Sequence, residues 1–241
     1  MSKKTDSEIL AKRALQIQRG AARAAVLGVN DGLVSVLCIV LAVAGAGAST
    51  GNVLLAAFAG LISGAVSMAA GEWISVKSQV ELFEGILGDL RKLFIDDRDL
   101  LVSKLEKSMV ESGQTPEIAK ASAQEMAKDD EKFVNLYAGQ VMGFNSEELG
   151  SPWVAAGSSF LLFTVGALAP TLPWVFTYFG YTTAVWLSII FTAIGSLIVG
   201  GYIASSSGKS VWYGALRQLG IVILASIVTY GIGYLFGVSV A

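Results

Sequence analysis

The sequence predicts an all-α integral membrane protein with five transmembrane helices and a three-helix cytosolic insert between spans two and three. Hydrophobic residues make up 54% of the 241-residue chain and charged residues only 15%, against roughly 25% charged residues in soluble domains. Five apolar stretches reach the ~20 residues that a helix needs to cross a hydrocarbon core of ~30 Å. Because backbone groups cannot stay unpaired in lipid, each stretch is expected to be helical.

This pattern divides the chain into an N-terminal segment (1–23), spans one and two (24–76), the insert (77–148) and spans three to five (149–241). The five spans are placed at about 24–48, 52–76, 151–176, 180–204 and 210–238. The N-terminal segment is basic, and its residues 6–20 are expected to form an amphipathic helix on the inner membrane surface. A solvated tail is the alternative.

The basic residues predict the orientation of the chain in the membrane. All 17 Lys and Arg fall before span one, between spans two and three, or around the connection from span four to span five. The other two connections and the C-terminal tail have none. Because basic residues accumulate in cytoplasmic segments, the N-terminus is expected in the cytosol and the C-terminus outside.

The insert is charge-rich, with fifteen carboxylates, yet its apolar residues recur at helical spacing. Its first helix is expected to continue directly from span two. Gly113 ends a second helix, and a third begins with Thr115 as N-cap and Pro116 at the first position, running to about residue 141. A disordered loop is the alternative. The carboxylates of the insert either bind cations or form a solvated face.

Only two of the 19 carboxylates, Asp31 and Glu72, fall within spans. An acid near mid-bilayer is costly and often marks an ion path. Asp31 lies ~10 Å from the inner end of span one at 1.5 Å per residue, and Ser35, four residues on, shares its helix face. Alternatively, Asn30-Asp31-Gly32 forms a turn at the interface and the span begins at Gly32.

Span two places Met68 and Glu72 on one face, with Met68 near the level of Asp31. Two carboxylates, a thioether and the hydroxyls of Ser35 and Ser67 would form a pathway suited to a divalent cation such as Fe²⁺ or Mn²⁺. The alternatives are that Met68 only fills space in the helix packing, and that Glu72 extends to water or pairs with Lys77.

Glycines four residues apart let helix backbones approach closely. Three such pairs lie in the spans: Gly28 with Gly32, Gly60 with Gly64, and Gly233 with Gly237. They pack either within one subunit or at a dimer interface.

Several classes of activity are excluded by composition. The chain has no histidine, which rules out Ser-His-Asp and Cys-His catalysis. Its one cysteine, Cys38, cannot form an intrachain disulfide. No phosphate-binding loop is present, so transport would be driven by a gradient rather than by ATP on this chain. We therefore predict no enzyme activity, no permanently bound cofactor and no nucleic-acid partner.

Two motifs, residues 28–35 (GVNDGLVS) and 67–79 (SMAAGEWISVKSQ), resemble those of the vacuolar iron transporter family. The resemblance covers most of residues 20–238, including the five spans, the insert, Ser151-Pro152 at the start of span three, and Pro170 and Pro173 near its outer end.

The resemblance implies a homodimer that moves Fe²⁺, and often Mn²⁺, out of the cytosol in exchange for protons. Asp31, Met68 and Glu72 would be the metal ligands of the pore, with Asn30, Ser35 and Ser67 beside them. The insert departs from the family, because Leu90, Leu93, Leu101, Lys104 and Asn145 stand where glutamates recur. Its usual metal cluster is therefore expected to be largely missing.

Two other functions stay open at this point. The chain could transport a different solute on the same scaffold, as the missing glutamates suggest. It could instead be a non-transporting membrane scaffold whose acidic insert binds a partner. A prokaryotic plasma membrane is the expected location.

Overall fold

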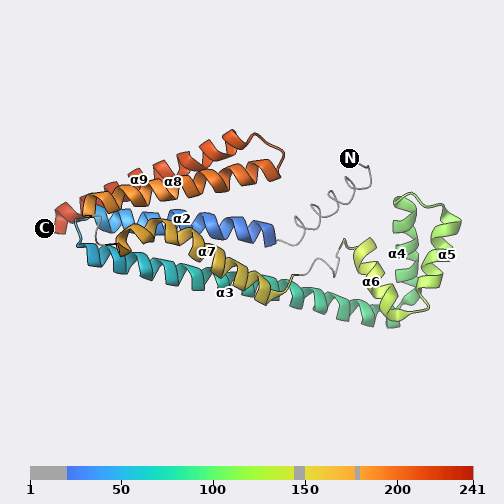
Figure 1. The fold of residues 1–241 in the computed structure, drawn as a ribbon. Coiled ribbons are helices and arrows are strands. Elements are labelled where there is room, and N and C mark those ends of the chain that lie inside the picture. Colours follow the sequence, from blue (N-terminus) through green and yellow to red (C-terminus); the bar gives the residue numbers. More distant parts are fainter. Residues whose placement is uncertain (1–20, 144–149, 177–179, 241) are drawn as a thin grey trace. The chain divides into compact units, whose positions relative to one another are not determined.

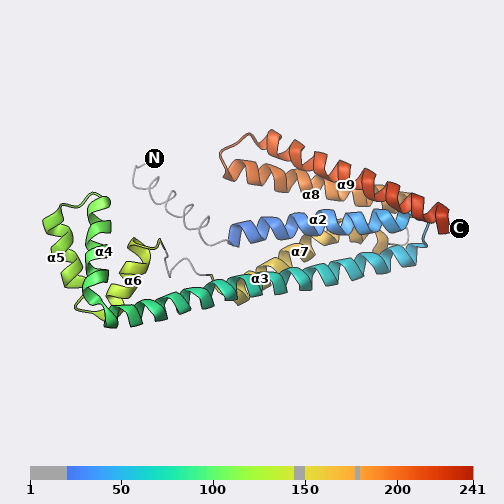
Figure 2. The ribbon, with the colours of Figure 1, turned by 180° about the vertical axis from the view of Figure 1, so that it is seen from behind.

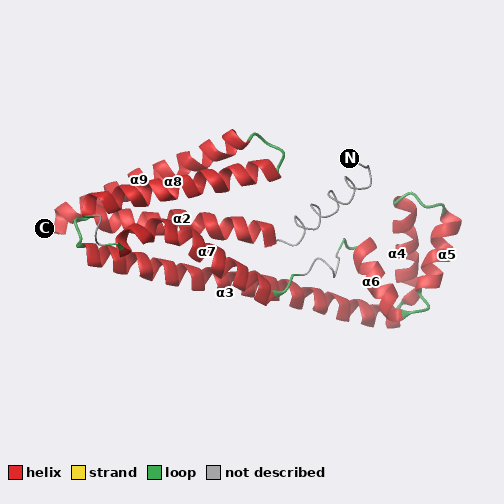
Figure 3. Cartoon of the chain, in the orientation of Figure 1, coloured by secondary structure: helices red, strands yellow, loops and turns green. Residues whose placement is uncertain are grey.

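The computed structural model describes residues 21–143, 150–176 and 180–240. Within these ranges the chain forms helices joined by short loops and turns, without any strand (Figure 3). It forms two compact units: Met1–Trp73 with Pro152–Ala241, here called the membrane unit, and Ile74–Ser151, here called the insert unit. The amphipathic helix predicted for residues 6–20 lies outside the described residues.

Five helices contribute to the membrane unit, and all five are long and apolar enough to cross a membrane. They are α2 (Ala21–Gly45), the first part of α3 (Thr50–Asp96), α7 (Pro152–Val175), α8 (Tyr181–Ser206) and α9 (Val211–Val240). The five predicted spans and the all-helical fold class are thereby confirmed. In both views of the ribbon α2 lies between the α8–α9 pair and α3 (Figures 1 and 2).

The core of the membrane unit is built around α2. Val36, Val40 and Leu37 of this helix are fully buried. The first two pack in a cluster with residues of α3 and α7, and Leu37 packs with Val222 of α9. The helix ends at Gly45, three residues before the predicted end of the span, because Gly47 takes a positive φ of 77° that terminates it.

Backbone-to-backbone contact joins α2 to α7. A Cβ atom at Gly32 would lie 2.2 Å from the carbonyl oxygen of Phe163, and one at Gly166 would lie 2.2 Å from that of Val29. At Gly28 the nearest atoms would be 3.4 Å away, which is an ordinary contact. Gly32 and Gly166 are therefore required for this approach, whereas Gly28 has room for a methyl group.

The other two glycine pairs also make contacts within the subunit. Cβ atoms at Gly60 and Gly64 would meet the side chains of Ile39 and Phe163, respectively. Gly233 lies directly against the backbone of α2 near Ala42. Packing within one subunit, one of the two alternatives raised by the sequence, thus accounts for each pair.

The insert unit contains the rest of α3 together with α4 (Arg98–Glu111), α5 (Pro116–Met126) and α6 (Asp130–Gln140). Its core is apolar and centred on Leu105, Phe133 and Val134. Phe94 and Phe133 stack with ring centroids 4.3 Å apart.

The prediction of a single third helix from 116 to about 141 is wrong. Thr115 and Pro116 do occupy the N-cap and first positions of α5, but this helix ends at Met126. Asp129 then starts α6, because its side chain accepts a hydrogen bond of 3.2 Å from the backbone N–H of Lys132. The described part of the insert therefore has four helical segments, counting the continuation of α3.

Candidate functional site

Asp31 lies inside a continuous helix. Because α2 is unbroken from Ala21 to Gly45, the alternative in which residues 30–32 form an interfacial turn is wrong. The hydroxyl of Ser35 donates a hydrogen bond of 2.5 Å to Oδ1 of Asp31. The pair thus sits on one helix face, where their spacing of four residues puts them.

The face of α2 that carries Asp31 is incompletely covered by the rest of the chain. Asp31 and Ser35 on this face are half-buried, whereas Cys38, two turns further on, is in contact with Thr229 of α9. On the other side of the helix Val36 and Val40 are fully buried. The carboxylate is therefore the polar centre of a half-buried stripe of α2, formed by Asp31 and Ser35 and here called the open face of α2.

Asn30 points elsewhere, towards α9. Its Oδ1 accepts a hydrogen bond from Nε2 of Gln218, whose side chain is only 5% exposed. Sequence reasoning missed Gln218, because the search for costly residues in spans was limited to ionisable side chains. An uncharged amide inside an apolar helix is a signal that would have found it.

On α3, Met68 is half-buried and packs against the cluster formed with α2 and α7, while Ser67 is exposed. Glu72 is partly exposed and forms no ion pair with any described residue. The alternative pairing with Lys77 is not observed, since the ammonium of Lys77 lies 3.3 Å from Glu81. Beside Glu72, the ring of Trp73 packs edge-on against Trp153 of α7, with centroids 5.7 Å apart.

One copy of the chain does not assemble a closed metal site. Within the described ranges no three His, Cys, Asp or Glu side chains lie close enough together to hold a metal ion, in either unit. Asp31 and Glu72 share no hydrogen bond there. Asp31 and Glu72 therefore belong to no larger cluster of acids in one copy of the described chain.

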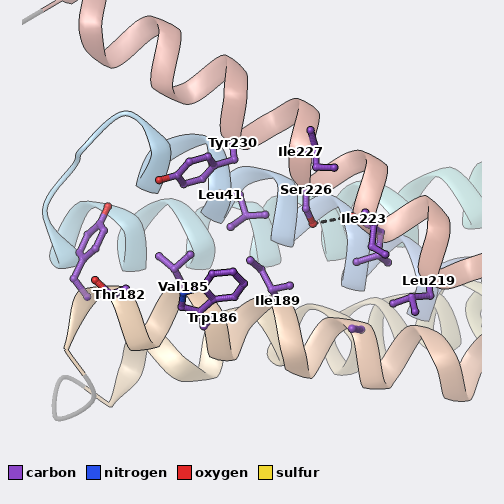
Figure 4. A pocket seen from close by; sticks show the side chains of 13 residues that line it. Leu41, Thr182, Val185, Trp186, Ile189, Leu219, Ile223, Ser226, Ile227 and Tyr230 are labelled. Carbon is purple, nitrogen blue, oxygen red and sulfur yellow. Dashed lines mark hydrogen bonds between the residues drawn. The ribbon is translucent and has the colours of Figure 1, made fainter.

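A separate cavity of about 510 Å³ lies between α8 and α9, with Leu41 of α2 among its lining residues (Figure 4). Its walls are mainly apolar, including Val185, Ile189 and Ile223. The hydroxyl of Ser226 donates back to the carbonyl of Val222 at 2.7 Å. The cavity has hydroxyl groups but no carboxylate or thioether in its lining, so the open face of α2, which carries Asp31, is the better candidate site for a cation.

Comparison with known proteins yields one family and a consistent set of relatives. The family model described as "VIT family" matches residues 22–234. A vacuolar iron transporter from Acanthamoeba castellanii is 31% identical over 90% of this chain and 78% of its own length. Vacuolar iron transporter homolog 2 of Arabidopsis thaliana is 29% identical over 89% of this chain and 84% of its own length. Vacuolar iron transporter homolog 1 of Oryza sativa subsp. japonica is 30% identical over 89% of this chain and 73% of its own length.

Proposed function

The chain belongs to the VIT family, and on that basis we propose that it transports divalent transition-metal ions, Fe²⁺ or Mn²⁺, across the membrane in which it is embedded. Its relatives are named as transporters, and it is not an enzyme. The observation that carries the proposal is Asp31, an acid inside an apolar span on the open face of α2. Such a residue costs about 2.5–3.5 kcal/mol to insert, a cost that a transport pathway explains.

Asp31, Met68 and Glu72 are the proposed metal ligands. Carboxylate oxygens suit hard divalent ions, and a thioether adds preference for softer transition metals over Mg²⁺ and Ca²⁺. Ser35 and Ser67 would supply further oxygens along the path. Ser35 already contacts Asp31 and would orient its carboxylate towards the ion.

The working unit is proposed to be a homodimer. The open face of α2 would otherwise expose Asp31 to lipid, and one copy gathers too few ligands. Apposition of two open faces would cover the acid and double the number of carboxylates around an ion. Fe²⁺ or Mn²⁺ is the substrate in this scheme, not a resident cofactor.

Proton exchange follows from the same carboxylates. A metal ion and a proton would bind to the same carboxylate oxygens, so the two would compete for one site. The distribution of Lys and Arg supports a cytosolic N-terminus and a cytosolic insert unit. Movement of the metal out of the cytosol is the direction that the resemblance to the family implies. The named relatives are eukaryotic and vacuolar, and they give no support to the predicted prokaryotic plasma membrane.

A metal panel in proteoliposomes tests the proposal. Vesicles with an acidic lumen should accumulate Fe²⁺ or Mn²⁺ when wild-type protein is present, and Asp31→Asn should abolish the accumulation. Asp89→Asn is the matched control, since Asp89 is exposed in the insert unit and pairs only with Lys92 among the described residues. If no divalent ion accumulates with the wild type, the chain transports another solute or acts as a scaffold.

A further inference from the structure

We infer that the interhelical amide pair Asn30–Gln218 is a positioning device that fixes the rotation of α2 and keeps Asp31 on the open face. Its effect on transport rests on the proposed function, whereas its effect on the rotation of α2 does not. Neither Asn30 nor Gln218 would touch the metal, and each would act through the neighbouring carboxylate.

The environment of the pair makes the hydrogen bond hard to replace. The side chain of Gln218 is almost completely buried, and the bond joins two different transmembrane helices. If Asn30 is removed, the buried amide of Gln218 is left without this partner, which is costly in apolar surroundings. The helices are therefore expected to keep the register that preserves the bond.

The stem of Gln218 is itself held in place by α8. A Cβ atom at Gly200 would lie 2.8 Å from Cβ of Gln218 and 2.5 Å from the carbonyl oxygen of Gly214. The absence of a side chain at Gly200 thus makes room for Gln218 in the seam between α8 and α9. From this fixed base the amide reaches Asn30 on α2.

A second anchor holds α2 on a different side. The backbone of α2 at Gly32 is in direct contact with α7 at Phe163. With 3.6 residues per turn, successive side chains point about 100° apart, so fixing the directions of residues 30 and 32 fixes that of residue 31 between them. Ser35 cannot substitute for the amide pair, because it lies on the same helix as Asp31 and turns with it.

Transport kinetics provide the first test. Gln218→Leu keeps a similar side-chain size but removes the bond. We expect the KM for Fe²⁺ or Mn²⁺ to rise roughly three- to fifteenfold, the range that corresponds to one interhelical hydrogen bond in a membrane protein, with little change in maximal rate or yield. The exchanged pair Asn30→Gln with Gln218→Asn conserves total length and should restore KM. Ser226→Ala is the control, since Ser226 is buried in α9 but bonds only within its own helix.

The second test needs no transport. Cys38 is the only cysteine, and it lies half-buried two turns from Asp31, in contact with Thr229 of α9. Its rate of modification by a membrane-permeant maleimide therefore reports the rotation of α2 against α9. Gln218→Leu should change this rate, Ser226→Ala should not, and the exchanged pair should restore it. The inference would be overturned if Gln218→Leu left the rate of Cys38 modification unchanged. It would also be overturned if Gln218→Leu altered this rate and the KM but the exchanged pair restored neither. A wild-type protein that moves no metal would instead refute the proposed function alone.

Discussion

The contact between α2 and α7 gives the sharpest prediction, because two glycines of one motif should behave differently. Gly32 faces the carbonyl oxygen of Phe163 at a distance that leaves no room for a methyl group, whereas Gly28, one turn earlier, has room. We therefore expect Gly32→Ala to destabilise the membrane unit and Gly28→Ala to be tolerated.

The magnitude follows from the geometry. The new Cβ at residue 32 would lie 2.2 Å from the oxygen of Phe163 and 2.9 Å from the backbone nitrogen of Ala167, so α7 must move by about 1 Å. Overpacking of this kind costs about 1–3 kcal/mol, and the helical preference of Ala over Gly returns about 0.5–1 kcal/mol. The net loss spans about 0–2.5 kcal/mol, and its midpoint of about 1 kcal/mol corresponds to a decrease in Tm of roughly 2–4 °C for a chain of this size.

Thermal unfolding of the detergent-purified protein, followed by tryptophan fluorescence, measures this decrease. Gly220→Ala on α9, where an added Cβ meets nothing within 4 Å, is the control and should leave Tm unchanged or raise it. Equal Tm values for Gly32→Ala and Gly28→Ala would refute the packing described for the segment that contains Asp31.

Three further predictions concern ligands and helix caps. Met68→Leu should preserve packing but raise the KM for Fe²⁺, while the control Met126→Leu in the insert unit should leave uptake unchanged. If Met68→Leu has the same KM as the wild type, the thioether of Met68 is not part of the pathway. Asp97→Ala removes the cap on the N–H of Leu100 and should lower the unfolding free energy of the insert unit by about 1 kcal/mol, measured by chemical denaturation. The hydrogen bond from Lys132 lowers the pKa of Asp129 below its ordinary value of 3.8. The ionised Asp129 should therefore stabilise the insert unit fully above that pH, and this stabilisation should disappear as the pH falls further. Circular dichroism measures the unfolding of the insert unit against pH, and Asp129→Asn should make its stability less dependent on pH in this range.

Local patterns in the sequence were sufficient for the elements and for one contact of the site. The length and apolarity of the five spans, and the spacing of Asp31 and Ser35, are properties of single segments, which explains why the structure agrees with them. The break before Asp129 was missed because the apolar pattern continues across it, so only the capping residue marks the new helix.

The pairing of Asn30 with Gln218 could not be read from local periodicity. These residues are 188 positions apart, and their meeting depends on how α2 and α9 are rotated and shifted against each other. That register is set by close contacts such as that of Gly233 with α2, which involve residues from distant parts of the chain. Glycine spacing predicts that close approach occurs but does not identify the partner.

The central claim, that Asp31 binds metal and proton in turn, is tested most directly by recording metal uptake and lumenal pH in the same proteoliposomes. With wild-type protein and an acidic lumen, we predict that Fe²⁺ or Mn²⁺ enters while the lumenal pH rises, and that Asp31→Asn stops both signals together. Metal uptake and proton efflux at wild-type rates in Asp31→Asn would contradict the claim.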